Sequence, residues 1–338
     1  MSDWSRYDES DAKVRPGKGS RPRSKQRPAH ADAVDGMVVG VDRGRYTVRT
    51  ADATVTGVKA RELGRRGLVV GDAVGLVGDV SGTADTLARI VRRDERASAL
   101  RRTADDSDAT ERVVVANADQ LAIVAALANP EPNPRIIDRC LVAGFDAGLP
   151  ELLVLTKADL ADSAPVRALY EPLGVTVIET SVKRDGGPEA DPGFRRLRDE
   201  LRDRRTVFVG PSGVGKSTLV NALVPGTDRA TGRVNDVTGR GRHTSTSSVM
   251  LEVPGGGWII DTPGVRSFGL AHVDPEHFLL AFPDVADFAA EHCPRGCQHL
   301  SAEDGCELDA WAAGDPDRAV KLDSIRRLLT SRAAGEAF

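Results

Sequence analysis

One segment of eight residues constrains the fold of this chain more than any other. Residues 210–217 read G-P-S-G-V-G-K-S and match the phosphate-loop pattern G-x-x-x-x-G-K-[ST] in full. A predicted strand at 206–209 enters this segment, and a predicted helix at 217–223 leaves it. The glycines let backbone N–H groups turn toward phosphate oxygens, and the start of the helix adds positive potential. We therefore expect a nucleotide site in an α/β sheet rather than a chance glycine-rich turn.

The phosphate site requires side chains as well as backbone groups. We expect Lys216 to reach the β- and γ-phosphates and the Ser217 hydroxyl to bind Mg²⁺. A second motif, D-T-P-G at 261–264, follows an apolar strand. Asp261 would hold Mg²⁺ through water, and the N–H of Gly264 would sense the γ-phosphate. The residues assigned to the phosphates and Mg²⁺ are Gly210, Pro211, Ser212, Gly213, Val214, Gly215, Lys216, Ser217, Thr218, Asp261 and Gly264.

Two further motifs indicate guanine as the base. Residues 156–159 read T-K-A-D after an apolar strand, similar to the guanine motif in which a carboxylate accepts from N1 and N2 and rejects adenine. Residues 180–183, T-S-V-K, follow the next strand, in the place of the loop that contacts guanine O6. A four-residue match also fits chance or a helix cap, but its place at a strand end beside the other motifs favours guanine. The residues assigned to the base are Thr156, Lys157, Asp159, Ser181 and Val182.

The order of these motifs differs from that of ordinary GTPases. The guanine motifs, at 156 and 180, precede the phosphate loop, which in ordinary GTPases comes first. Because the site needs only the convergence of loops at the carboxyl edge of a sheet, we expect a circularly permuted domain. Apolar runs alternate with helical stretches such as 134–147, which predicts a mainly parallel sheet with helices on both faces. The predicted strands are 121–127, 151–155, 175–178, 206–209 and 257–260.

A Gly/Arg/Thr-rich stretch at 238–246 is the candidate for switch I. Thr244 in this stretch is the candidate second hydroxyl on Mg²⁺. Many GTPases orient the attacking water with a glutamine directly after D-x-x-G, but this chain has Val265 there, which cannot orient water. His243 is the nearest suitable side chain and is therefore the candidate catalytic residue. The alternatives are that His243 is merely exposed, or that hydrolysis awaits a group from a partner.

The chain begins with a basic tail. Residues 13–27 contain seven Lys or Arg and no acidic residue, and Pro and Gly interrupt them. Such a segment cannot bury apolar surface, so we expect residues 1–34 to be disordered. The tail is either simply solvated or an arm that contacts nucleic-acid phosphates.

Short alternating segments follow the tail at 36–41, 46–50, 68–77 and 86–91. They predict a small antiparallel barrel over 35–96, of OB type, although an SH3-like barrel has similar features. Tyr46 is the only aromatic residue that could stack a base, so RNA would be bound through its backbone. Basic residues cluster in the predicted loops and at the exit of the barrel: Lys59, Arg61, Arg65, Arg66, Arg92, Arg93 and Arg96.

Four soft ligands near the C-terminus have the spacing C-x3-C-x-H-x6-C. They are Cys293, Cys297, His299 and Cys306. Three thiolates and one imidazole suit tetrahedral Zn²⁺, and four protein ligands leave no open position, so we expect a structural site. A disulfide or reduced surface cysteines are the alternatives, and the adjacent His292 could replace the histidine ligand. Cys140 lies on the apolar face of a predicted helix and is expected in the core.

The composition excludes several classes of protein. The chain has 338 residues, 40% hydrophobic and 28% charged, as expected for two or three globular domains. It has no apolar run of about 18 residues, so no membrane span is expected. The N-terminus lacks the apolar core of a secretory signal, and four cysteines do not suggest a disulfide framework, so we expect a cytoplasmic protein. No feature indicates an oligomer, so we expect a monomer.

Together these residues resemble the RsgA (YjeQ) family of circularly permuted bacterial GTPases, which act in maturation of the small ribosomal subunit. The resemblance covers nearly the whole chain from about residue 35, through T-K-A-D, G-P-S-G-V-G-K-S, D-T-P-G and the Cys/His pattern. It implies that the OB and zinc domains contact 16S rRNA and that the 30S subunit stimulates GTP hydrolysis. It also implies that the switch I histidine, here His243, assists hydrolysis. The basic tail has no counterpart in the family pattern.

One residue departs from the family's guanine motif. Thr156 stands where asparagine is commoner, and we expect that threonine cannot make the same bridging hydrogen bonds. The affinity for guanine should then be somewhat lower, while Asp159 preserves selectivity.

The expected organisation is a multidomain α/β protein. Its parts are a disordered tail at 1–34, an OB-type barrel at 35–96, a permuted GTPase domain at 97–270 and a helical zinc-binding domain at 271–338. Its expected partners are GTP or GDP with Mg²⁺ and the 30S subunit with its 16S rRNA, with no DNA and no membrane. Two other functions compete with this one. A P-loop small-molecule kinase is disfavoured by the paired guanine motifs, and a nucleotide-gated RNA-binding module with negligible turnover is suggested by Val265.

Overall fold

The computed structural model describes residues 30–64, 67–102, 112–227, 248–262, 270 and 278–333. From Asp32 onward these residues belong to one compact unit, Asp32–Phe338. Several predicted features lie outside the described residues: the tail at 1–29, Arg65, Arg66, the switch I candidate with His243 and Thr244, and Gly264 and Val265.

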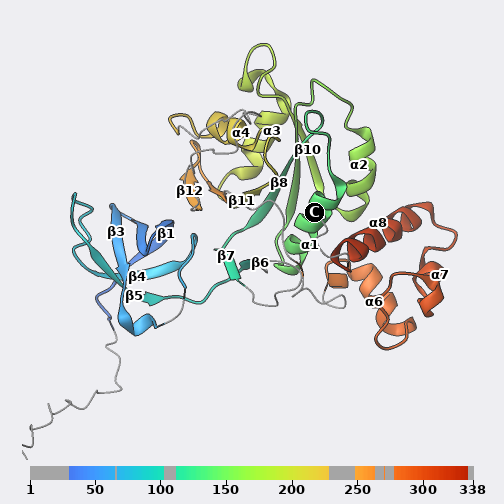
Figure 1. Ribbon diagram of the computed structural model, residues 1–338, viewed down its shortest axis with the longest axis horizontal. Coiled ribbons are helices and arrows are strands. Elements are labelled where there is room, and N and C mark those ends of the chain that lie inside the picture. Colours follow the sequence, from blue (N-terminus) through green and yellow to red (C-terminus); the bar gives the residue numbers. More distant parts are fainter. Residues whose placement is uncertain are drawn as a thin grey trace, which may run out of the picture. The chain divides into compact units, whose positions relative to one another are not determined.

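The first strands form a closed five-stranded barrel (Figure 1). They are β1 (Val34–Asp42), β2 (Arg45–Thr50), β3 (Thr54–Lys59), β4 (Ala73–Gly78) and β5 (Ala88–Arg93). They pair in the order β1-β2-β3-β5-β4, and β4 pairs again with β1, so the ring closes. Alternate side chains point inward, as the alternating pattern predicted, and Val48, Leu76 and Ile90 are fully buried. The OB-type barrel is therefore confirmed.

Two details of the barrel differ from the prediction. Strand β3 was not predicted, because its threonines and a glycine weaken the apolar alternation, and its pairing with β2 and β5 stabilises it instead. The segment predicted as one strand at 68–77 is broken at Gly71, where φ is +91°. A Cβ there would lie 1.9 Å from the carbonyl oxygen of Ala116, so only glycine fits and the chain turns before β4.

The second part of the chain is built on a mainly parallel sheet. Its strands are β8 (Gln120–Ala126), β9 (Glu151–Thr156), β10 (Thr176–Thr180), β11 (Arg205–Val209), β12 (Val249–Glu252) and β13 (Trp258–Asp261). Their order is β10-β9-β8-β11-β13-β12, and all neighbours are parallel except β12, which runs antiparallel to β13. The five predicted strands are confirmed, but β12, which also pairs with β1, was not predicted. A two-stranded ribbon, β6 (Ala99–Arg102) and β7 (Arg112–Ala116), precedes the sheet.

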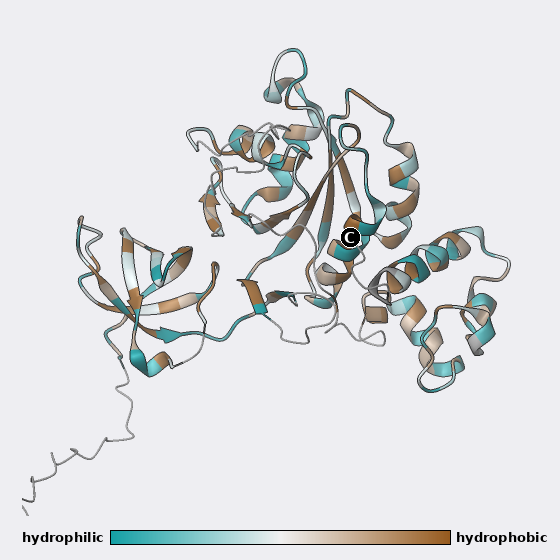
Figure 2. Cartoon of the chain, viewed as in Figure 1, coloured by the Kyte–Doolittle hydropathy of each residue, from teal (hydrophilic) through white to brown (hydrophobic). Residues whose placement is uncertain are grey.

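Helices cover both faces of this sheet because its strands are apolar on both sides. Every residue of β8 is buried, and Figure 2 shows the central strands mainly in the hydrophobic colour. The helices are α1 (Pro134–Asp146), α2 (Ala164–Tyr170), α3 (Pro192–Leu201) and α4 (Lys216–Leu223). One core contains α1 and α2 with Cys140, as predicted, and the other contains α3 and α4. The α/β class is therefore confirmed.

The C-terminal part is helical, with α6 (Pro283–His292), α7 (Leu308–Ala312) and α8 (Pro316–Ala333). Helix α8 packs on α1 through a buried polar contact. Arg327 donates from Nε to Asp138 Oδ2 at 3.0 Å, and Tyr170 donates to Asp138 Oδ1 at 3.0 Å. Burial raises the pKa of Asp138, and the guanidinium opposes that shift. Among the described helices, none combines the length and apolar composition that a membrane span requires.

A half-buried acid at the start of β9, Glu151, predicts a specific pH dependence of stability. Burial raises the pKa of Glu151 to about 9 from an ordinary 4.5, and its Oε1 has no hydrogen-bond partner. Above pH 4.5 the folded protein therefore holds a proton that the unfolded chain releases. The free energy that this proton contributes to folding is fully present below the unfolded pKa of 4.5. It is lost as the pH rises from there through the folded pKa of about 9, at up to about 1.4 kcal/mol per pH unit.

Glu151→Gln should remove this pH dependence. We expect the variant to gain at least about 1 kcal/mol in free energy of unfolding at pH 8 and to gain least near pH 5. Denaturant unfolding across this range is the measurement. A pH profile parallel to that of the wild type would contradict the assignment.

Candidate nucleotide site and metal cluster

The predicted nucleotide motifs meet at one edge of the parallel sheet. Strands β9, β10 and β11 end at Thr156, Thr180 and Val209, directly before the guanine motifs and the phosphate loop. The chain proceeds outward from β8 to β9 and β10, then returns to place β11 on the other side of β8. Loops on either side of such a reversal form the usual ligand crevice of α/β sheets. The strand order therefore brings the motifs together at this edge, although they follow a permuted order in the sequence.

The phosphate loop connects β11 to α4 as predicted. Gly210 has φ of +154°, and a Cβ there would lie 2.4 Å from the carbonyl oxygen of Val124 in β8. The loop therefore sits closely on the sheet only because this position is glycine. Gly215 is the N-cap of α4, so Lys216 and Ser217 are the first residues of the helix, where positive potential is highest.

The guanine motif T-K-A-D is joined directly to the phosphate loop. Lys157 donates from Nζ to the Gly213 carbonyl at 3.1 Å and also to the Asn129 carbonyl in the loop after β8. The Thr156 hydroxyl donates to the Val214 carbonyl. The short hydroxyl reaches this carbonyl because β9 ends beside the phosphate loop. That threonine cannot make the same bridging hydrogen bonds as asparagine stays a prediction.

Asp159, the residue assigned to guanine N1 and N2, is exposed, and a hydrogen bond holds its side chain in place. The Ser181 hydroxyl donates to its Oδ1, and this hydrogen bond lowers the pKa of the carboxyl, which stays ionised as an acceptor. The 180–183 loop is held in turn by Asp191, whose Oδ2 accepts from the Thr180 hydroxyl at 2.7 Å and from the Ser181 N–H at 2.6 Å. Val182 follows Ser181 in this loop and is partly buried.

Asp191 is a residue that the sequence analysis missed. It is buried, and it also caps α3 by accepting from the Gly193 N–H at 3.0 Å. The signal was present, because Asp followed by Pro marks the start of a helix. The signal indicated a cap, however, and gave no indication that the second carboxylate oxygen would hold the guanine loop.

At the phosphate end of the site, Lys216 Nζ contacts Asp261 Oδ1. Both groups are well buried, with side-chain exposures of 14% and 3%. Thr262 is anchored by donating its hydroxyl to the Phe208 carbonyl at 3.1 Å. The lysine assigned to the phosphates and the carboxylate assigned to Mg²⁺ therefore lie side by side, beside the start of α4.

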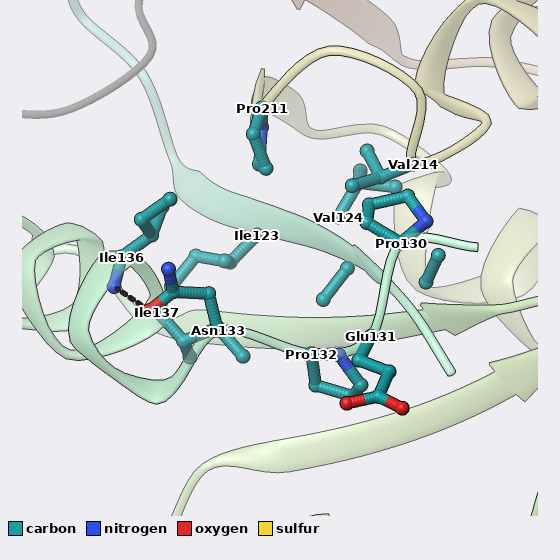
Figure 3. Close-up of a pocket in the computed structure, with 12 residues that line it drawn as sticks. Ile123, Val124, Pro130, Glu131, Pro132, Asn133, Ile136, Ile137, Pro211 and Val214 are labelled. Carbon is teal, nitrogen blue, oxygen red and sulfur yellow. Dashed lines mark hydrogen bonds between the residues drawn. The ribbon is translucent and has the colours of Figure 1, made fainter. Parts of the chain in front are cut away.

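An apolar pocket of about 210 Å³ adjoins the phosphate loop (Figure 3). Pro211 and Val214 contribute from the loop, Ile123 from β8 and Ile136 from α1. Asn133 caps α1 at its rim by accepting from the Ile136 N–H. Pro211 and Val214 are also assigned to the nucleotide, so the pocket borders the candidate site, although its apolar lining does not suit phosphates or Mg²⁺.

Two of the basic residues that cluster at the exit of the barrel are paired with carboxylates of the protein. Arg96 donates to the fully buried carboxylate of Asp72 at 2.7 Å, and Arg92 pairs with Asp35 and Asp94. These ion pairs hold the exit of the barrel, and binding of RNA by the cluster stays a prediction. Of the other described members of the cluster, Arg61 is exposed.

The four predicted metal ligands lie together. The Sγ atoms of the three cysteines and a ring nitrogen of His299 all lie within 4.8 Å of one another. Cys306 Sγ is 3.8 Å from His299 Nδ1, and the described cysteines are all free. His292 is exposed and stacks on Phe288 instead, so it does not replace His299. Three thiol groups and one imidazole at this spacing fit a tetrahedral metal ion.

Arg326 on α8 supports this cluster from outside. It donates from Nε to the His299 carbonyl at 3.3 Å and makes two bonds of 2.8 and 2.6 Å to Asp309. Groups of this kind orient the ligands of metal sites. The sequence showed only an amphipathic arginine-bearing stretch here, so this role was not predicted.

Known proteins are similar to this chain over most of its length. A family model described as RsgA GTPase matches residues 93–271. A small ribosomal subunit biogenesis GTPase RsgA from Chlorobaculum parvum is 34% identical over 313 residues, spanning 89% of this chain and 98% of that protein. The protein of the same name from Chlorobaculum tepidum is 35% identical over 315 residues, spanning 89% and 99%.

Two solved structures have a similar fold. YjeQ from Thermotoga maritima aligns with a TM-score of 0.61 at 23% identity, over 88% of this chain and 98% of that one. YloQ, described as a circularly permuted GTPase, aligns with a TM-score of 0.60 at 19% identity, over 90% and 97%. Both likenesses agree with the permuted strand order.

Proposed function

This chain belongs to the RsgA GTPase family, and from that premise we propose which of its residues carry the activity. It is a GTPase of small ribosomal subunit biogenesis, hydrolysing GTP to GDP and phosphate. The observation that carries the residue assignment is the direct joining of T-K-A-D to the phosphate loop by Lys157 and Thr156. These hydrogen bonds link the groups assigned to the base with the groups assigned to the phosphates.

We assign the residues as follows. Asp159 accepts from guanine N1 and N2, and the 180–183 loop contacts O6. Lys216 and the N–H groups of the phosphate loop bind the phosphates, and Ser217 with Asp261 holds Mg²⁺, which supplies charge neutralisation when bound. The contact of Lys216 with Asp261 supports this assignment, because it places both groups at the start of α4.

The proposal also covers the identity of the metal ion and of the macromolecular partner. Three thiol groups and one imidazole support Zn²⁺ as the ion at the Cys/His cluster, in a structural role. We propose the 30S subunit with its 16S rRNA as the partner, engaged by a monomer in the cytoplasm. The domain boundaries at 34, 96 and 270 stay predictions from the sequence.

Two measurements test the proposed function together. Purified protein should bind GTP in strong preference to ATP, and should co-sediment with small ribosomal subunits in the presence of a non-hydrolysable GTP analogue. Equal affinity for ATP would contradict the guanine assignment. Preference for GTP without subunit binding would contradict the partner.

His243→Ala tests the catalytic assignment, which rests on the sequence alone. General acid–base or water-positioning groups contribute about 10²- to 10⁴-fold, so the variant should lose at least about a hundredfold in subunit-stimulated turnover. Its affinity for GTP should be unchanged. His292→Ala, which alters an exposed histidine outside the nucleotide motifs, is the control. Undiminished turnover in His243→Ala would show that the group comes from elsewhere.

A further inference from the structure

Helix α3 carries an arginine stripe that the nucleotide motifs do not use. Arg195 and Arg198 lie three residues apart on one side of α3, and Arg202, four residues further on, is the C-cap residue that directly follows the helix, so the three span about 10 Å along its axis. The side that packs on the sheet is a separate apolar stripe, made of Phe194, Leu197 and Leu201. The arginines therefore border the buried face and point along the surface of the domain.

The end of this stripe lines a pocket of about 280 Å³. Its lining residues are Arg198, Arg202, Pro254, Gly255 and Gly256. The last three form the turn between β12 and β13, at the amino edge of the sheet. The two glycines carry no side chain, so an extended ligand can approach the turn closely. The nucleotide motifs lie at the opposite, carboxyl edge, so this surface is independent of the nucleotide site.

The arginines of the pocket have spare donors. Arg198 Nη1 contacts Glu189 at 2.7 Å, and Arg202 Nη2 contacts Asp199 at 3.0 Å. Both pairs are exposed, with side-chain exposures from 38% to 66%, and exposed pairs are weak. A guanidinium has five N–H donors, so each arginine can also bind a phosphate oxygen.

The charge around the stripe favours a polyanion. Residues 195–205 contain six arginines and three acidic residues. By contrast, Arg96 at the barrel exit is held by the fully buried carboxylate of Asp72. Asp203 lies beside Gly256.

We propose that the arginine stripe and the adjacent glycine turn bind the phosphate backbone of RNA. Three guanidinium groups along about 10 Å can follow consecutive phosphates of one strand. The absence of base-stacking groups from this lining makes the contact independent of sequence. This inference rests on the proposed function for its partner, since the RNA would be that of the small ribosomal subunit.

The test uses the full chain with two exposed arginines changed, Arg198→Gln/Arg202→Gln, and purified small ribosomal subunits. Affinity should be about tenfold or more weaker at 50 mM salt. The slope of log affinity against log salt should fall by roughly 0.7 to 0.9 for each phosphate that the variant no longer neutralises. Turnover of GTP without subunits should be unchanged, which shows that the variant is folded.

Arg196→Gln is the matched control, because Arg196 lies on the same helix about 100° away from Arg195 and carries the same charge. It should keep the wild-type affinity and salt slope. If the double variant also keeps both, or if Arg196→Gln loses as much per arginine, the inference is wrong. If the wild type fails to bind subunits at all, the proposed function fails instead.

Discussion

Asp159→Asn should change the base that this protein binds from guanine to xanthine. The carboxylate is assigned to two charge-assisted hydrogen bonds with N1 and N2 of guanine, and the hydrogen bond from Ser181 lowers its pKa further below neutral. Losing both bonds should weaken GTP binding by about 3 to 4 kcal/mol, or roughly a hundred- to a thousandfold. Xanthine has an oxygen in place of the 2-amino group, and an asparagine amide can donate to it.

Equilibrium binding of fluorescent GTP and xanthosine triphosphate analogues measures this change. Asp162→Asn is the matched control, because it makes the same chemical change in the same loop, where Asp162 accepts from the Ala164 N–H at the start of α2. This control should bind GTP as the wild type does. If Asp159→Asn keeps its affinity for GTP and gains none for the xanthine nucleotide, the guanine motif is assigned wrongly.

His299→Ala should disrupt the C-terminal helices through loss of the metal. Metal binding supplies about 10 to 16 kcal/mol of folding free energy in small zinc domains, so losing one of four ligands should cost several kcal/mol. Burial raises the pKa of the Cys293 thiol to about 11, so without a cation this thiol remains protonated at neutral pH. Helices α7 and α8 should therefore lose packing, while Lys157 and the phosphate loop stay in place.

Three readouts separate this effect from general unfolding. Metal content by elemental analysis should fall, thiol reactivity should rise, and GTP affinity should change less than about threefold. His292→Ala, one residue before the first cysteine, should retain the metal, because that side chain stacks on Phe288 outside the cluster. A metal-replete His299→Ala with wild-type thermal stability would contradict the assigned ligand set.

The site was predictable from the sequence because its chemistry depends on short contiguous motifs. The phosphate loop, T-K-A-D and the aspartate at a strand end each indicate a function by themselves. The rule that loops meet at the carboxyl edge of a sheet predicted how these motifs are arranged. The Cys/His spacing likewise predicted one cluster, although the choice between His292 and His299 required the structure.

Features that depend on contacts between distant residues were not predictable. Strands β3 and β12 have weak patterns of their own and exist through pairing with neighbours. The second role of Asp191 depends on the approach of α3 to β10, which no local pattern encodes. The arginines at the barrel exit appeared free in the sequence, because nothing there shows that Arg96 faces the buried Asp72.

The most direct test of the whole account is the rate of GTP hydrolysis with and without purified small ribosomal subunits. Because Val265 replaces the water-orienting glutamine, turnover by the protein alone should be slow. Addition of saturating subunits should raise it by at least about tenfold, with no comparable turnover of ATP. An unchanged rate, or equal turnover of ATP, would contradict a ribosome-stimulated GTPase.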